Sequence, residues 1–78
     1  MRTMKQLNRY LSKVSGNRLE IIHGYGYFYY AQTEKEFSEN RCKQPPPSEY
    51  GVCYISQGNT EIWKHMLDAA VKEYDRNG

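Results

Sequence analysis

The sequence has no long apolar run and is short for an enzyme. Hydrophobic residues make up 38% and charged residues 26% of its 78 residues, a balance typical of a folded domain rather than of a disordered chain. No stretch approaches the roughly 18 apolar residues that a membrane-spanning helix needs. Polar residues interrupt the basic N-terminus where a signal peptide would have its apolar segment. We therefore expect one small domain, residues 1–78, in the cytoplasm and not in a membrane.

The patterns that mark catalytic and metal sites are also missing. The two cysteines, Cys42 and Cys53, are too few for a disulfide framework and lack C-x-x-C spacing. We expect both to be reduced, with a single bridge between them as the alternative. Neither His23 nor His65 has cysteines or carboxylates at metal-ligand spacing. There is no nucleophile elbow and no phosphate-binding glycine loop, since the G-x-G at 24–26 fits a tight turn better. We expect no enzyme activity, no cofactor and no metal.

Acidic residues are absent from the start of the chain. Residues 1–18 contain five basic residues and no acidic one, whereas the remaining sixty contain six basic and nine acidic residues. The overall charge of +2 therefore hides a basic segment followed by a net negative remainder. Such asymmetry can indicate an arm that binds nucleic acid or an acidic partner. A solvated helix face is the simpler interpretation of the same residues.

The basic segment has the pattern of an amphipathic helix. Apolar residues recur every three or four positions from Met4 to Val14, which is one stripe of a helix. Thr3 can cap the start, and Gly16 is a natural C-terminal stop. The opposite side carries the candidate nucleic-acid-binding residues Arg2, Lys5, Arg9 and Lys13.

The next segment changes to the pattern of a β-hairpin. Residues 18–23 and 25–31 are β-branched and aromatic, with glycines between them. A two-residue turn at Gly24-Tyr25 would pair Ile21 with Phe28, whereas a three-residue turn would shift the pairing and mix the two faces. With the two-residue turn, the core face holds Leu19, Ile21, Phe28 and Tyr30, and the other face holds Glu20, Ile22, Tyr27 and Tyr29.

Residues 32–49 are predicted to form a polar loop. They end in three consecutive prolines, Pro45–Pro47, which forbid a helix and favour a stiff extended segment. Phe37 is the only large apolar residue in this stretch, so we expect it to anchor the loop. The prolines could be a ligand for another domain, but a spacer is the simpler interpretation.

A third strand and a second long helix follow the loop. Residues 50–56 alternate Val52 and Tyr54 on one face with Cys53 and Ile55 on the other. The helix, over residues 60–75, has apolar residues across an arc of about 200°, wider than the roughly 100° of an ordinary surface helix. We expect two of its sides to be buried, by the first helix and the sheet or by a second subunit.

The expected fold is α+β in the order α-β-β-β-α. A three-stranded antiparallel sheet would have both helices packed on one face, because two short helices can cover only one face. The other face would stay open and carry tyrosines. The chain has eight tyrosines against two phenylalanines and one tryptophan, and tyrosine keeps a polar tip that tolerates water.

Two resemblances involve the tyrosine-rich strand. Residues 23–30 resemble the RNP1 element of RNA-recognition motifs, whose strand aromatics stack on unpaired bases. We interpret this similarity as coincidental, because that family has Lys or Arg in place of His23 and needs an earlier strand. Residues 24–30 and 50–55 together with Trp63 resemble a group of small bacteriophage and mobile-element proteins with a G-x-G-Y-F-Y strand and a Trp-led last helix. That resemblance implies a phage or mobile-element origin and carries over no catalytic residue.

Two classes of function fit these observations. The first is a non-enzymatic protein-binding module, because tyrosine buries much area with few rotatable bonds and keeps a hydrogen bond. Its partner would be a host protein, such as a defence complex that it inhibits, or a second copy of the chain in a homodimer. The alternative is single-stranded nucleic-acid binding, in which the basic helix binds phosphates and strand tyrosines stack on bases. The candidate partner-binding residues are Tyr25, Tyr27, Tyr29 and Ile22.

Overall fold

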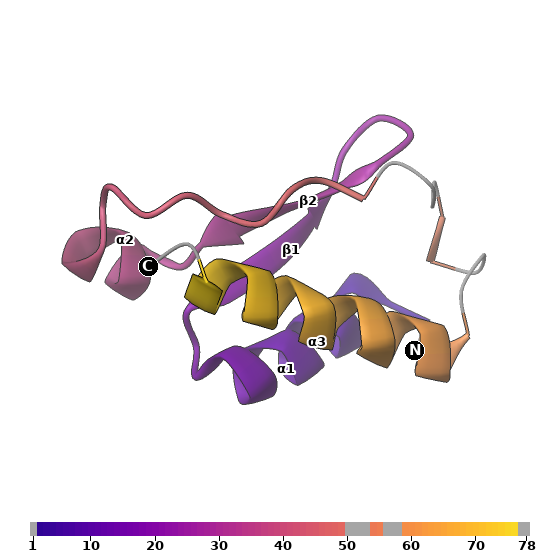
Figure 1. The fold of residues 1–78 in the computed structure, drawn as a ribbon. Coiled ribbons are helices and arrows are strands. Elements are labelled where there is room, and N and C mark those ends of the chain that lie inside the picture. The colour runs from indigo at the N-terminus through magenta and orange to yellow at the C-terminus, as the bar shows by residue number, and fades with distance from the viewer. Residues whose placement is uncertain (1, 50–53, 56–58, 77–78) are drawn as a thin grey trace.

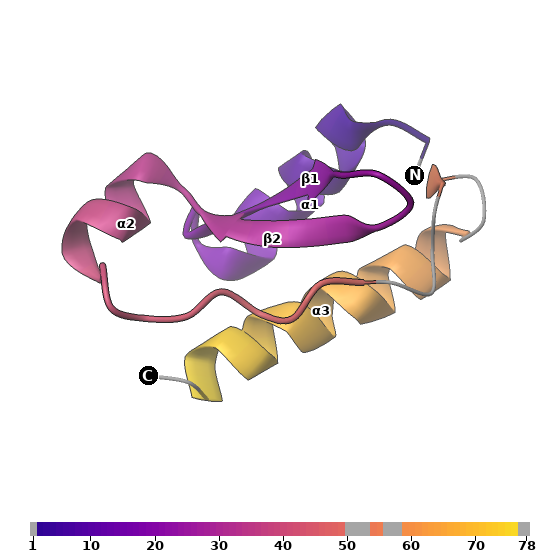
Figure 2. The same ribbon diagram turned by 90° about the horizontal axis from the view of Figure 1, so that it is seen from above.

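Two antiparallel strands and three helices make up the part of the chain that the computed structural model describes, residues 2–49, 54–55 and 59–76 (Figure 1). Helices α1 and α3 both lie on one side of the hairpin (Figure 1), and in the view from above α1 lies beneath the hairpin with α3 alongside (Figure 2). The fold class is α+β, as predicted. In chain order the elements are α1 (Met4–Ser15), β1 (Leu19–His23), β2 (Phe28–Gln32), α2 (Glu34–Glu39) and α3 (Thr60–Arg76).

The predicted three-stranded sheet is wrong, and so is the order α-β-β-β-α. Within the described residues the sheet consists of β1 and β2 alone. Residues 50–53 and 56 of the predicted third strand lie outside the described residues, and Tyr54 and Ile55 are not in a strand. The chain beside β2 is instead the segment that ends at Glu49. It makes one bridge, in which Phe28 N–H donates to Glu49 O at 3.1 Å and Glu49 N–H donates to Phe28 O at 2.7 Å.

The triple proline explains why pairing on this edge does not go beyond one bridge. If the antiparallel pairing of Phe28 with Glu49 continued, Pro47 would lie opposite Tyr30 and Pro45 opposite Gln32. Every second residue of β2 turns its N–H and C=O toward this edge. Proline has no N–H to donate to those carbonyls. The prolines therefore run beside β2 as an extended segment without becoming a third strand (Figure 2).

The hairpin turn lies one residue later than predicted. Gly24 N–H donates to Tyr27 O at 2.8 Å, which leaves two residues in the turn. The second of them, Gly26, has φ of 72°, a left-handed conformation that glycine adopts without strain. Ile21 consequently lies opposite Tyr30, two positions from its predicted partner. Because side chains alternate with a period of two, this two-residue shift leaves the predicted core face unchanged.

Side chains of α1 close the outer edge of β1. Asn8 Oδ1 accepts from Ile21 N–H at 2.8 Å, and Asn8 Nδ2 donates to Ile21 O at 3.0 Å. Ser15 Oγ accepts from Leu19 N–H at 3.2 Å. The edge groups of β1 thus have partners that a neighbouring strand would otherwise supply. The helix itself begins and ends as predicted, with Thr3 as N-cap and a left-handed Gly16 as C-cap.

The predicted loop over 32–49 contains a helix, α2. Thr33 Oγ1 accepts from Glu36 N–H at 3.4 Å and caps the start of α2. Glu34 and Glu36 lie in the first turn, where acidic side chains favour the helix dipole. The buried residue of α2 is Glu36, and Phe37 is 51% exposed. The prediction that Phe37 anchors this segment is therefore wrong.

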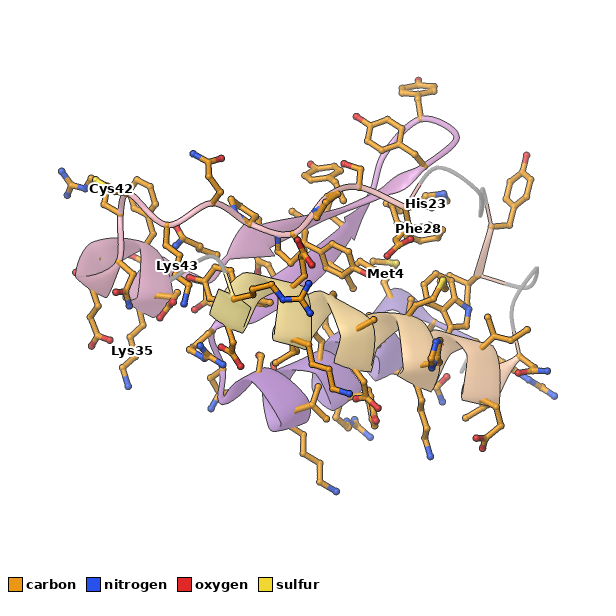
Figure 3. The ribbon with its side chains drawn as sticks, in the orientation of Figure 1. Met4, His23, Phe28, Lys35, Cys42 and Lys43 are labelled. Carbon is orange, nitrogen blue, oxygen red and sulfur yellow. The ribbon has the colours of Figure 1, made fainter. Side chains whose placement is uncertain are left out.

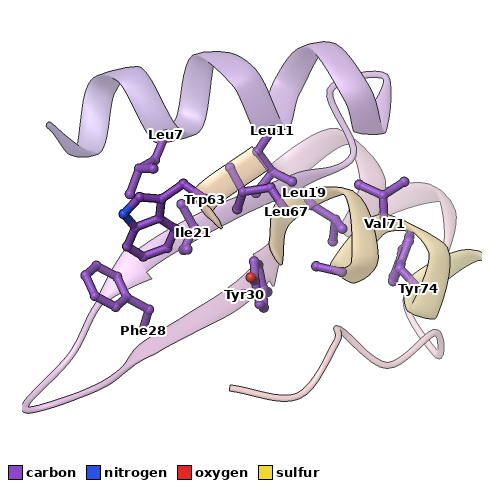
Figure 4. Close-up of a cluster of buried hydrophobic side chains, with 11 residues drawn as sticks. Leu7, Leu11, Leu19, Ile21, Phe28, Tyr30, Trp63, Leu67, Val71 and Tyr74 are labelled. Carbon is purple, nitrogen blue, oxygen red and sulfur yellow. The ribbon is translucent and has the colours of Figure 1, made fainter. Parts of the chain in front are cut away.

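The core lies between the hairpin and the two long helices (Figure 4). The ring of Trp63 packs edge-on against Phe28, with centroids 5.1 Å apart, and Trp63 Nε1–H donates to Ile55 O at 2.9 Å. On the wide apolar arc of α3, Ile62 stays 47% exposed and Ala69 is also exposed, so α1 and the sheet cover most of the arc but not all of it. The buried hydrophobic residues are Leu7, Leu11, Leu19, Ile21, Phe28, Tyr30, Trp63, Leu67, Ala70, Val71 and Tyr74.

Candidate functional site

All four candidate partner-binding residues lie on the hairpin, on its turn or on the face away from the helices. Ile22 pairs with Tyr29 across the strands. The rings of Tyr27 and Tyr29 are 5.9 Å apart, tilted by 39°, and each is partly exposed. Tyr25 lies at the turn and is fully exposed. We call these four residues the tyrosine surface.

The position of Tyr27 depends on a neighbouring glycine. A Cβ atom at Gly24 would lie 2.8 Å from the Tyr27 ring, closer than real Cβ contacts allow. The Tyr27 ring therefore lies directly over the Gly24 backbone. On the opposite, core-facing side of the same strands, the His23 ring stacks on Phe28 with centroids 4.4 Å apart (Figure 3). The aromatic residues of β2 are thus divided between the core and the tyrosine surface by strand alternation alone.

The tyrosine surface borders a hollow along the edge of β2. This hollow has a volume of about 430 Å³, and we call it the tyrosine groove. A second hollow of about 360 Å³ lies on the other side of the prolines, against α3. Pro46 is buried and lines both. The tyrosine groove is lined by Tyr27, Tyr29, Tyr30, Pro45, Pro46, Pro47 and Ser48.

A buried polar network joins α2, β2 and α3 near the other end of the hairpin. Tyr74 Oη–H donates a short hydrogen bond to Glu36 Oε2. Gln32 Nε2 donates to Tyr74 Oη at 2.8 Å, and Asn40 Nδ2 donates to Glu36 Oε1 at 3.2 Å. Both carboxyl oxygens therefore have donors, which is what allows Glu36 to be buried. Each of these groups is used in holding α2 in place, so we interpret the network as structural.

Sequence reasoning missed this network although one signal for it is present. Thr33 followed by Glu36 has the S/T-x-x-E spacing of a capping box, which marks a helix N-terminus. The spacing of apolar residues in the last helix marks Tyr74 only as one of its apolar positions. Its ring also lies beneath two cations, with Lys43 Nζ 4.3 Å and Arg18 Cζ 5.5 Å from the centroid. Arg18 in turn pairs with Asp75 at 2.8 Å, and this hydrogen bond lowers the pKa of Asp75.

We expect alkaline pH to destabilise the fold through three tyrosines. Burial is the main cause that raises the pKa of Tyr30, and the nearby Glu49 raises it further. Burial also raises the pKa of Tyr74, with a second contribution from its hydrogen bond to Glu36. The hydrogen bond from Tyr10 to Asp68 raises the pKa of Tyr10. A raised pKa means that the folded state holds the proton more tightly, so stability is retained below the ordinary tyrosine value of about 10 and falls above it. Urea unfolding followed by circular dichroism between pH 8 and 11 measures this.

The control for the alkaline effect is Tyr30→Phe, which removes one of the three titrating groups. The variant should lose less stability than the native chain over the same pH range. Equal stability at pH 8 and 11 in the native chain would contradict the raised tyrosine pKa values.

The four basic candidate residues are exposed: Lys5, Arg9 and Lys13 lie on α1, and Arg2 lies just before its N-cap. Within the described residues, no carboxylate oxygen lies within 4.0 Å of their charged nitrogens, the distance that defines an ion pair. Leu7 and Leu11 on the same helix face the core, so the basic side points away from the sheet. Strand alternation places Ile22, Tyr27 and Tyr29 on the other face of that sheet, away from the two helices, which both lie on one side of the hairpin (Figure 1). The structure thus does not bring the two candidate sets together: Arg2, Lys5, Arg9 and Lys13 lie on one side, and Ile22, Tyr27 and Tyr29 on the other.

The described residues contain no group of three or more side chains that could hold a metal ion. Among them, no helix is long and apolar enough to span a membrane. Cys42 is a free, exposed thiol, and Cys53 lies outside the described residues. Comparisons with protein-family models, curated proteins and solved structures gave no match. The resemblance to phage and mobile-element proteins therefore stays a prediction, and what the fold defines is a small α+β chain whose hairpin has a partly exposed tyrosine face.

Proposed function

We propose that this chain is a non-enzymatic protein-binding module and that the tyrosine surface is its contact site. The observation that carries the proposal is the position of Tyr25, which is fully exposed, and of Tyr27 and Tyr29, which are partly exposed, beside a core that is complete without them. Aromatic side chains grouped beside a hollow are typical of the residues that dominate binding energy at protein interfaces. The partner is a host protein, if the chain is encoded by a phage, or else a second copy.

The double variant Tyr27→Ala/Tyr29→Ala tests the contact site. We expect it to keep the native fold by circular dichroism but to lose capture of the partner from a host lysate, because both rings lie outside the core. The matched control is Phe37→Ala, which removes a half-exposed aromatic outside the tyrosine surface. If the double variant unfolds, the two tyrosines belong to the core and the proposal fails. Capture that survives in a folded double variant would equally rule out this surface.

The mass in solution separates the two kinds of partner. Light scattering at low and high salt should give 9.2 kDa, the mass of one chain, if the tyrosine surface is free for a host protein. A mass twice as large would assign the surface, or the uncovered side of α3, to self-association.

Nucleic-acid binding is the second candidate, favoured by the exposed cations on α1 and just before it. Replacement of Arg2, Lys5, Arg9 and Lys13 by Glu should leave protein capture unchanged and abolish any binding to single-stranded DNA. Each phosphate contact releases a counterion, so such binding must weaken steeply as salt is raised. DNA binding that persists in the charge-reversed variant would exclude this face.

A further inference from the structure

Among the described residues that line the tyrosine groove, none has a charged side chain. Its walls are tyrosine rings on one side and Pro45–Pro47 on the other, with Ser48 at one end. A groove without cations has nothing to neutralise a phosphate backbone. An apolar peptide segment therefore suits this groove better than a nucleic acid.

The backbone at the edge of β2 restricts which peptide can bind. Tyr30 lies opposite Ile21 in a pair that exchanges no ladder hydrogen bonds. The N–H and C=O of Tyr30 therefore point away from β1 and toward the groove. Within the described residues, neither group makes a hydrogen bond. Pro45–Pro47 carry no N–H, so the donors that face the groove come from β2 and from side chains. A segment that binds here therefore needs carbonyl oxygens that can accept from them.

Proline-rich segments have this property. Their backbone carries carbonyl acceptors without N–H donors, and they adopt the polyproline II helix without internal hydrogen bonds. In the groove, the N–H of Tyr30 and the hydroxyls of Tyr29 and Ser48 are groups that can donate to such carbonyls. Aromatic-lined grooves are also the surfaces on which proline-rich segments dock in known recognition modes.

The spacing of the two rings fits the same kind of segment. The Tyr27 and Tyr29 centroids are 5.9 Å apart. Three consecutive prolines in a polyproline II helix advance about 6 Å from the first to the third. A run of three prolines can therefore cover both rings at once.

We propose that the tyrosine groove binds a proline-rich segment in the polyproline II conformation. This inference rests on the proposed function, since it names the chemistry of the partner at the same surface. The prolines of the chain itself form the fixed wall of the groove, and the partner's prolines pack between that wall and the Tyr27 and Tyr29 rings. The carbonyls of the bound segment accept from the edge of β2.

The test uses a ten-residue polyproline peptide with blocked ends as the probe and a glycine-serine peptide of equal length as its control. Titration of the full chain, followed by amide signals in NMR, should give saturable shifts in residues 27–30 and Ser48. This mapping needs no variant. Tyr29→Ala should weaken binding by on the order of tenfold, as loss of a central aromatic contact does. Phe37→Ala should leave the affinity unchanged.

Three results would overturn the inference. They are equal binding of both peptides, shifts that map outside the groove, and an affinity that Tyr29→Ala does not change in a folded variant. The proposed function has its own readout. If the polyproline peptide does not bind but the double tyrosine variant loses partner capture, the tyrosine surface remains the contact site and only its preference for proline is wrong. If capture is also unaffected, both proposals fail.

Discussion

Replacement of Trp63 by alanine is expected to lower the free energy of unfolding by about 3–5 kcal/mol. The side chain is fully buried, packs edge-on against Phe28 and donates a hydrogen bond to Ile55 O. The change would remove the contact between α3 and the hairpin and leave a cavity at the centre of the core. Since small domains have only about 5–15 kcal/mol of total stability, the loss should be visible as partial unfolding at 37 °C. Urea denaturation followed by circular dichroism measures it.

The matched control is the preceding residue on the same helix. Ile62 is half-exposed, so Ile62→Ala should cost less than about 1 kcal/mol. Similar losses in the two variants would mean that Trp63 is not the centre of the core.

Replacement of Glu36 by alanine should have the next largest effect, a loss of about 1–3 kcal/mol. The variant leaves the Tyr74 hydroxyl without its acceptor and removes the partner of the Asn40 amide. A buried donor without a partner costs more than the average hydrogen bond contributes. Thermal unfolding of the two chains, followed by circular dichroism, measures the difference.

Two further substitutions identify the cause of that loss. Glu39→Ala changes an exposed glutamate of the same helix and should stay within about 0.5 kcal/mol of the native chain. Glu36→Gln retains an oxygen that can accept from Tyr74 and should restore part of the stability. If Glu39→Ala is as harmful as Glu36→Ala, the loss follows from removing either glutamate of α2 and the buried network is not responsible.

The helices show how far local pattern determines structure. The caps of α1 at Thr3 and Gly16 and its buried side, with Leu7 and Leu11, were predicted from spacing and are confirmed. These properties depend on residues within one or two turns of each other, so the sequence contains all the information that they need. The short helix α2 has the same local signal in Thr33 and Glu36, but the polar composition around it favoured a loop. Its stability comes from Tyr74, which lies on another helix.

In the hairpin, too, one property follows from local pattern and another depends on tertiary structure. Strand alternation determined that Leu19, Ile21, Phe28 and Tyr30 face the core, and this held although the turn lies one residue later than predicted. The pairing itself depended on whether Gly24 or Gly26 adopts positive φ. Two glycines separated by one residue are nearly equivalent locally, and only packing of the whole hairpin on α1 and α3 distinguishes the two registers.

The sequence by itself therefore determined the fold class, the two long helices and the buried face of each strand, because these follow from the spacing of neighbouring residues. Tertiary structure alone decided that the sheet has two strands and that the prolines lie beside β2. Each of these features joins residues far apart in the chain. Their free energy depends on a partner that no local window of sequence contains.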